Sequence, residues 1–253
     1  MLEAGFREHG CCALSALLTP AELDLLRRHC DARRAQVSDE LLCESDCVLE
    51  ACSLPGERHP ARKDAAAYLK LRAAVYDDDG DRDGLHDIII RKLAAVAAAA
   101  LGSPPLLFNE HFVAKPARVG GPFRWHTDAA HQLEAEYALS PPDASDHPPY
   151  VSIWCALDDL NDDNGPLVLL PSDVPQPPDA LWHRPADDET EAWLEAHADA
   201  LTTSGLRAGD VVLFSSRLWH LSRPNVSERE RRVFYAQVIL ATDDDVCQPL
   251  TCV

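Results

Sequence analysis

The sequence predicts a mostly β fold with a helical N-terminal part. Helix-forming patterns fill the N-terminal third of the chain, and short runs rich in β-branched and aromatic residues follow Pro105. Pro, Gly, Asn and Asp punctuate these runs, as turn residues do between strands. At 253 residues the chain has the length of one such domain. We therefore expect a single domain over residues 1–253, with mainly helical support and loops over 1–104 and the β core over 105–253.

The first expected helix has a well-marked start. In Thr19-Pro20-Ala21-Glu22 the threonine can cap the helix, the proline suits the first helical position, and the glutamate completes a capping box. Apolar residues follow at helical spacing, so we expect the helix to run to about Arg34.

Two further helices are expected at residues 62–76 and 84–101. The second carries apolar residues at helical spacing, and Gly102 follows as a stop signal. Residues 37–60 carry Cys, Ser, Pro and charged residues without a clear period, so we expect a loop there.

The β core is expected to contain several strands joined by long connections. We place strands at residues 106–118, 148–157, 166–170, 206–215 and 231–241. Of the connections, 171–205 is expected to hold a short acidic helix near 189–201. Loops of this length in a compact domain are usually functional or disordered, so we expect lid insertions near 129–149 and 171–205.

The chain is strongly acidic. With 23 basic and 42 acidic residues, its formal net charge is −19. Phosphate binding needs a basic surface, so we expect neither a nucleic-acid nor a membrane partner. No apolar run reaches the ~18 residues of a membrane span, and the N-terminus has no secretory signal pattern, so a cytoplasmic protein is expected. The expected partner is a small-molecule substrate; the sequence leaves the oligomeric state open and favours a monomer.

The nine cysteines do not predict a disulfide framework, because their number is odd and the chain is long. Cys43, Cys47 and Cys52 are crowded, but they lack the close CxxC pairing of structural zinc. We expect free thiols.

Two histidines and one aspartate have a spacing that suits a metal site. His126 and Asp128 are two residues apart, so on a strand both side chains project from the same face. His220 follows the apolar run at 211–214 and lies near the end of a predicted strand. Two histidines and one carboxylate on one face of an octahedron form the facial triad of non-haem Fe(II) oxygenases, which leaves three positions open. A His-x-Asp pair alone is a weak signal in a chain with 11 histidines.

An arginine-rich segment after His220 strengthens the signal. An arginine at the start of the strand that follows can form a bidentate pair with a carboxylate. A dicarboxylate cosubstrate that chelates the metal at one end would need such a partner at the other. The alternative is a basic turn that makes surface salt bridges.

The order and spacing of several segments resemble the phytanoyl-CoA dioxygenase family of Fe(II)/2-oxoglutarate oxygenases. The resemblance covers most of the chain. It includes Phe6-Arg7-Glu8-His9-Gly10, the helix at 17–28, Lys115-Pro116, Trp125-His126-Thr127-Asp128, the segments 151–159 and 164–171, the run 209–214 and the segment from His220 to Tyr235. The family fold implies a double-stranded β-helix core (a cupin-like jelly roll) flanked by α-helices.

The resemblance implies that His126, Asp128 and His220 bind Fe(2+), and that 2-oxoglutarate and O2 are used with it. It implies no catalytic residue beyond the metal centre. In halogenating relatives a small residue replaces the carboxylate ligand, so the presence of Asp128 favours hydroxylation. The chain departs from the family pattern at residues 171–174, which leaves the substrate open.

The resemblance also implies a cosubstrate site. The arginine that binds 2-oxoglutarate falls on Arg231, with Arg232 as the adjacent alternative. Ser222 matches a position whose hydroxyl helps to hold the same carboxylate, and Lys115 and Trp154 match positions that line the cosubstrate pocket.

The implied function is an Fe(II)/2-oxoglutarate-dependent dioxygenase that hydroxylates or otherwise oxidises a small-molecule or acyl substrate, with succinate and CO2 as co-products. The alternatives are a 2-oxoglutarate-independent cupin-like metal protein and a non-catalytic module. His131, Gln132 and the segment 182–184 are candidates to face the pocket. His111, on a predicted strand, is expected to be a core or surface histidine, and Asn164-Gly165-Pro166 is expected to be a turn that shapes the pocket.

Overall fold

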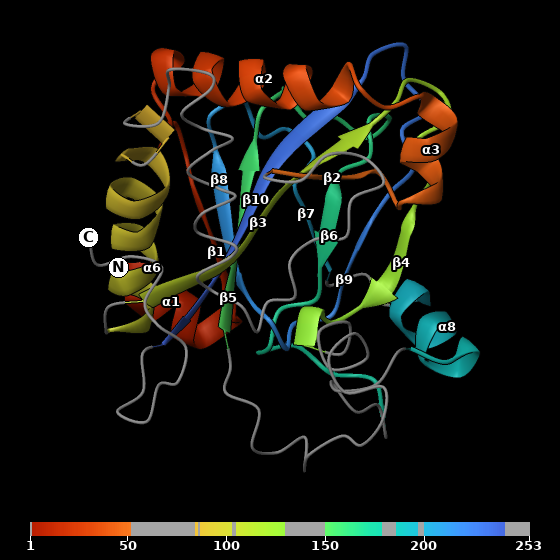
Figure 1. The fold of residues 1–253 in the computed structure, drawn as a ribbon. Coiled ribbons are helices and arrows are strands. Elements are labelled where there is room, and N and C mark those ends of the chain that lie inside the picture. Colours follow the sequence, from red (N-terminus) through yellow and green to blue (C-terminus); the bar gives the residue numbers. More distant parts are fainter. Residues whose placement is uncertain are drawn as a thin grey trace, which may run out of the picture.

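The computed structural model describes residues 2–51, 84–85, 87–102, 105–129, 150–178, 186–196 and 200–240 (Figure 1). The helix expected at 62–76 lies outside the described residues. So do His131, Gln132 and the segment 182–184, together with most of the lid expected near 129–149.

Two antiparallel sheets form the core, as expected for a double-stranded β-helix. One has the order β1-β8-β5-β10-β3-β2 and the other the order β4-β9-β6-β7. The first consists of β1 (Cys11–Leu14), β8 (Val211–Ser215), β5 (Tyr150–Ala156), β10 (Arg231–Leu240), β3 (Pro105–Lys115) and β2 (Val48–Glu50). The second consists of β4 (Phe123–His126), β9 (His220–Ser222), β6 (Leu167–Leu169) and β7 (Leu201–Thr202).

Strand β10 lies inside the larger sheet, between β3 and β5. Arg231 is opposite Lys115 on β3, and Tyr235 is opposite Trp154 on β5. Because side chains alternate along a strand, Arg231, Val233, Tyr235 and Gln237 share one face of β10. Val233 and Tyr235 pack there with residues of both sheets, so this face points to the space between the sheets.

The other face of the larger sheet is covered by helices. Phe234, Ala236 and Val238 pack there with α2 (Pro20–Arg34) and α6 (Ala94–Leu101), and Phe6 of α1 (Leu2–His9) joins the same cluster. Figure 1 shows α2 across one end of the strands and α6 along the side of the sheet. The helical N-terminal part therefore supports the sheet from outside.

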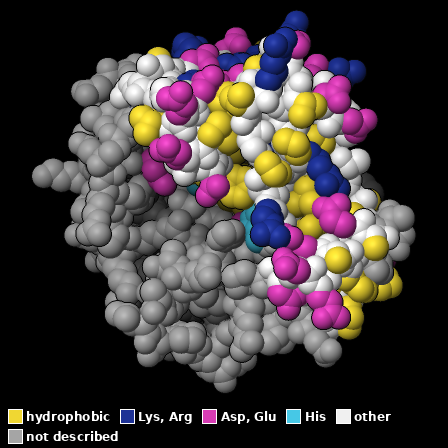
Figure 2. Space-filling model, turned by 90° about the vertical axis from the view of Figure 1, so that its right-hand side faces the viewer, with side chains coloured by type: hydrophobic (Ala, Val, Ile, Leu, Met, Phe, Trp, Pro, Cys, Tyr) yellow, Lys and Arg dark blue, Asp and Glu magenta, His cyan; other side chains and the backbone are white. Residues whose placement is uncertain are grey.

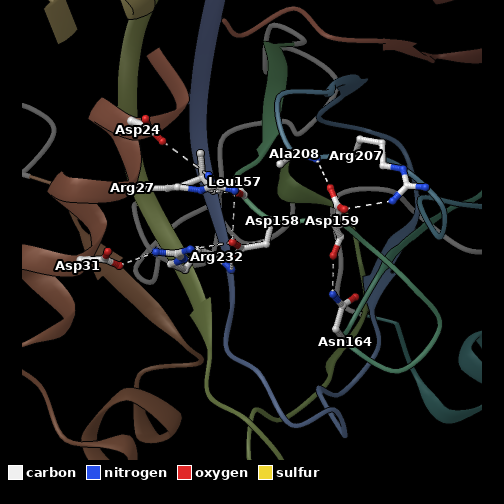
Figure 3. A network of polar contacts seen from close by, with 10 residues as sticks. All are labelled: Asp24, Arg27, Asp31, Leu157, Asp158, Asp159, Asn164, Arg207, Ala208 and Arg232. Carbon is white, nitrogen blue, oxygen red and sulfur yellow. Dashed lines mark hydrogen bonds and ion pairs between the residues drawn. The ribbon is translucent and has the colours of Figure 1, made fainter. Parts of the chain in front are cut away.

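A polar network joins α2 to the start of β10 (Figure 3). Arg232 donates to Asp158 and to Asp31 of α2, both at 2.7 Å. Arg27 of α2 donates to the carbonyl of Leu157 at 2.8 Å. The network holds the strand end that carries Arg231 on its other face.

The first expected helix is confirmed, with the Thr19–Glu22 capping box in place. The helix expected at 84–101 is interrupted: a π-helical segment, η1 (Asp87–Leu93), precedes α6, and Gly102 ends α6 with a left-handed φ of 76°. The acidic helix expected near 189–201 is α8 (Asp188–Ala196).

The loop expected over 37–60 is wrong for its first part. Ser38 caps a short helix, α3 (Asp39–Glu44), and β2 follows it. β2 is a strand because its three residues pair with β3, which makes β2 the edge of the larger sheet. Nothing in a three-residue run predicts that pairing.

No helix within the described ranges has both the length and the apolar character needed to span a membrane. The six cysteines in those ranges carry free thiols, as expected: Cys11, Cys12, Cys30, Cys43, Cys47 and Cys155.

Candidate metal centre and its cavity

A cavity of about 290 Å³ lies between the two sheets. His126, Asp128 and His220 line it, and so do Arg231, Ser222 and Trp154. The cavity therefore brings together side chains that lie about ninety residues apart in the sequence.

The pairing of β4 with β9 builds the cluster. β4 ends at His126, which is opposite His220, the first residue of β9, and Asp128 follows two residues after β4. The Nε2 atoms of His126 and His220 lie 3.9 and 3.5 Å from Asp128 Oδ1. One ligand atom from each residue can be chosen so that all lie within 4.8 Å of one another, and no other such group of His, Cys, Asp and Glu exists among the residues that the structure describes.

Backbone contacts set the tautomer of both histidines. Nδ1 of His126 lies 2.7 Å from the carbonyl oxygen of Arg124, and Nδ1 of His220 lies 2.9 Å from that of Leu218. A carbonyl oxygen only accepts, so each Nδ1 carries the hydrogen and each Nε2 presents its lone pair to the cavity. This is the form that binds a metal ion.

Two hydroxyls hold the carboxylate of Asp128. Ser152 and Tyr235 both donate to Oδ2, so Oδ1 is left facing the histidines. Burial alone would raise the pKa of Asp128, but His220, His126 and the Ser152 hydroxyl hold it well below its usual range. Burial and the charge of Asp128 raise the pKa of Tyr235, so the phenol stays a donor. Asp128 is therefore an oriented anion.

Arg231 is a buried cation with unused hydrogen-bonding capacity. Its side chain is 1% exposed. Nε and Nη2 donate to the carbonyls of Asn164 and Gly165 at 3.3 and 2.9 Å, while Nη1 is buried without a partner among the described residues. The guanidinium lies 5.8 Å from the ring centre of Trp154. Burial lowers the pKa of Arg231 to about 10, so the guanidinium is charged at neutral pH. A buried charge whose Nη1 has no partner among the described residues is suited to binding an anion.

Lys115 is the second buried cation nearby. Its Nζ donates to the carbonyls of Ser222 and Arg223 at 3.3 and 2.7 Å. Burial, followed by repulsion from Arg231, lowers the pKa of Lys115 to about 7. The structure thus places Lys115 behind the residues that line the cavity, where it holds the backbone of β9.

Because side chains alternate along β10, the neighbouring Arg231 and Arg232 point in opposite directions. Arg232 points away from the cavity into the network of Figure 3, whereas Arg231 lines the cavity. Gly165 closes the turn beside it with a φ of +81°. A Cβ on Gly165 would lie 2.7 Å from the carbonyl oxygen of Arg223 and 3.3 Å from Nη2 of Arg231, so the turn packs closely against both residues.

Sequence reasoning missed several residues of the cavity. Tyr235 and Ser152 hold Asp128, and no motif indicated either role. His111 was expected in the core or on the surface, but it lines the cavity, together with Asn109 and Gln237. If the register of β3 with β10 had been known, side-chain alternation would have placed these residues on the same face of the sheet as Arg231.

The fold and the site together define a jelly-roll protein with two histidines and one carboxylate arranged to bind a metal. The phytanoyl-CoA dioxygenase (PhyH) family model matches residues 6–233, and the chain belongs to this family. No curated protein sequence matches it.

Solved structures with this fold include AviO1 from Streptomyces viridochromogenes Tue57. It is 22% identical with a TM-score of 0.60, and the match covers 98% of this chain and 96% of AviO1. EctD from S. alaskensis, solved with 2-oxoglutarate and 5-hydroxyectoine, is 18% identical with a TM-score of 0.62, over 99% of this chain and 78% of EctD. The α-ketoglutarate-dependent epimerase SnoN from nogalamycin biosynthesis is 19% identical with a TM-score of 0.60, over 95% and 82%.

Proposed function

We propose that the chain is an Fe(II)- and 2-oxoglutarate-dependent dioxygenase that hydroxylates a small-molecule substrate. One observation carries the proposal: a three-residue ligand set and a buried guanidinium with an unpaired Nη1 line the same cavity. The ligand set suits Fe(II), and the guanidinium suits the far carboxylate of a diacid. Family membership supports the same reaction class.

The donor set fits the metal. His126 and His220 present unprotonated Nε2 atoms, and Asp128 presents one oxygen of an ionised carboxylate. Such a donor set would hold Fe(II) and would leave room on it for a 2-oxo acid. When bound, iron and 2-oxoglutarate supply the oxidation R–H + O2 + 2-oxoglutarate → R–OH + succinate + CO2.

The chain's own residues bind the cosubstrate and orient it. Along β10, Arg231 lies four residues from Tyr235, or about 13 Å, which the arginine side chain and a five-carbon diacid can span together. Arg231 pairs with the far carboxylate, and Ser222 adds a hydroxyl from β9. Lys115 fixes the β9 backbone that carries Ser222. Leu167 and Phe214 supply apolar walls that limit the entry of water.

Related folds catalyse more than hydroxylation, since SnoN is described as an epimerase. Hydroxylation is our proposal for this chain because Asp128 keeps the carboxylate ligand. A 2-oxoglutarate-independent metal protein would have no use for the buried, incompletely paired Arg231.

The test is succinate formation from 2-oxoglutarate by the protein with Fe(II) and dioxygen, without added substrate. We expect slow uncoupled turnover in the native protein and none in His126→Ala or Asp128→Ala. Unchanged turnover in either variant would refute the metal assignment. A native protein that neither forms succinate nor gains thermal stability from 2-oxoglutarate with Mn(II) would refute the proposed function.

A further inference from the structure

Strand β10 runs along the cavity, and the residues on its inner face distinguish the two ends of the cavity. Arg231, Tyr235 and Gln237 all line the cavity from this face. Arg231 marks the cosubstrate end, and Tyr235 marks the level of the metal because its hydroxyl donates to Asp128. Gln237 lies two residues further on, about 7 Å along the strand. Under the proposed function, the part of the cavity beyond the metal is left for the substrate.

Polar side chains from neighbouring strands form the wall of this far end. The register of β3 and β10 sets Asn109 opposite Gln237 and His111 opposite Tyr235. Nδ2 of Asn109 donates to Oε1 of Gln237 at 2.8 Å and lies 3.4 Å from Nδ1 of His111. The His111 ring stacks on Tyr235 with ring centres 4.8 Å apart. These contacts fix the orientation of the polar groups before any substrate arrives.

A fixed polar wall selects against an alkyl chain. Asn109 and Gln237 line the cavity, and an apolar substrate packed against them would offer no hydrogen bond to their amide groups. Packing an alkyl chain against polar groups without a hydrogen bond costs free energy and weakens its binding. A molecule with several hydroxyls can donate to and accept from amide and imidazole groups, and so avoids this cost.

The charges around the cavity select against an anionic substrate. Among the described lining residues, Arg231 is the only Lys or Arg, and the cosubstrate uses it, whereas Asp46 and Glu50 add carboxylates to the lining. Helices α3 and α8 both begin with acidic residues. Figure 2 shows acidic side chains grouped on either side of a hollow in which histidine is visible. Once the cosubstrate occupies Arg231, the described lining offers no further Lys or Arg to pair with an anionic substrate.

We infer that the cavity beyond the metal binds a small, hydroxyl-rich molecule without negative charge, such as a cyclitol or a glycoside, and that Asn109, His111 and Gln237 determine this specificity. The inference rests on the proposed function. It excludes acyl-CoA thioesters and fatty acids as substrates.

The experiment measures how added compounds change the rate of succinate formation by the Fe(II)-loaded protein. One set contains monosaccharides, methyl glycosides and cyclitols, and the other contains acyl-CoA thioesters and fatty acids. The variant Asn109→Leu/Gln237→Leu removes both amides together, so neither is left buried alone. Asn109→Ser is a milder variant in case the double variant does not fold. Gln36→Leu, an exposed amide of the segment after α2, is the matched control.

We expect acceleration by members of the hydroxylated set alone. The ratio of stimulated to unstimulated rate should fall about tenfold in the double variant and less in Asn109→Ser, as expected for the loss of two hydrogen bonds or one. Gln36→Leu should respond as the native protein does.

Acceleration by the acyl set would overturn the inference, as would no acceleration by the hydroxylated set or an undiminished response in both cavity variants. If the native protein forms succinate but gives one of these results, only the inference fails. If it forms no succinate at all, the proposed function fails and the inference with it.

Discussion

Replacing Arg231 by methionine should remove most of the binding energy for 2-oxoglutarate. Arg231 is fully buried, so solvent does not weaken its interaction with a bound carboxylate. Two hydrogen bonds to a charged group contribute about 1.5–3 kcal/mol each, so their joint loss should weaken binding by at least about 100-fold. The methionine side chain fills a similar volume without a charge.

Ligand-induced thermal stabilisation provides the assay, with Mn(II) in place of Fe(II). At a 2-oxoglutarate concentration about 100 times its Kd, the native protein should gain about 2.7 kcal/mol of stability. For a chain of 253 residues this corresponds to a rise in Tm of about 5–10 °C. In Arg231→Met the Kd rises about 100-fold, so the same 2-oxoglutarate concentration is about equal to it. The stability gained from the ligand is then roughly 0.4 kcal/mol, or about 1 °C in Tm.

Arg232→Met is the matched control because Arg232 points the other way, into the network with Asp158 and Asp31. Its loss should lower the Tm without ligand but leave the 2-oxoglutarate shift intact. A full shift in Arg231→Met, or a lost shift in Arg232→Met, would show that we have assigned the wrong arginine.

Three further predictions concern residues around the site. Tyr235→Phe leaves Asp128 Oδ2 with one hydroxyl donor, so Mn(II) affinity measured by electron paramagnetic resonance should fall about 10–100-fold; unchanged affinity would contradict the positioning role. Burial lowers the pKa of Lys115 from its ordinary 10.5 to about 7 in the folded chain, so the unfolded chain binds more protons between these values and stability should rise with pH there. The Tm of the native apo-protein minus that of Lys115→Met should therefore increase from pH 7 to pH 9, and a flat or falling difference would be inconsistent with the buried ammonium. Gly165→Ala should be destabilising by more than about 1 kcal/mol, because φ is +81° and the new Cβ meets a carbonyl oxygen at 2.7 Å. Gly205→Ala, with φ +93° and no atom within 4 Å of the Cβ, should lose less in thermal unfolding, and equal losses would exclude the steric reason.

Local sequence determined the parts of this protein that depend on short-range physics. The capping box fixed the start of α2, and Gly102 fixed the end of α6, because both act within one helical turn. His126 and Asp128 are close in sequence, but β4 ends at His126, so the alternation expected along a strand does not apply to Asp128. The family resemblance supplied the jelly roll and the pairing of these residues with His220.

Only the tertiary structure decided which side chains face the cavity. Arg231 and Arg232 are adjacent and chemically identical, and the register of β10 with β3 and β5 alone turns one inward and the other toward α2. The same register brings Asn109 and Gln237 together across 128 residues of sequence. A shift of one residue would exchange the two faces, and sequence near a strand does not encode the partner that sets its register.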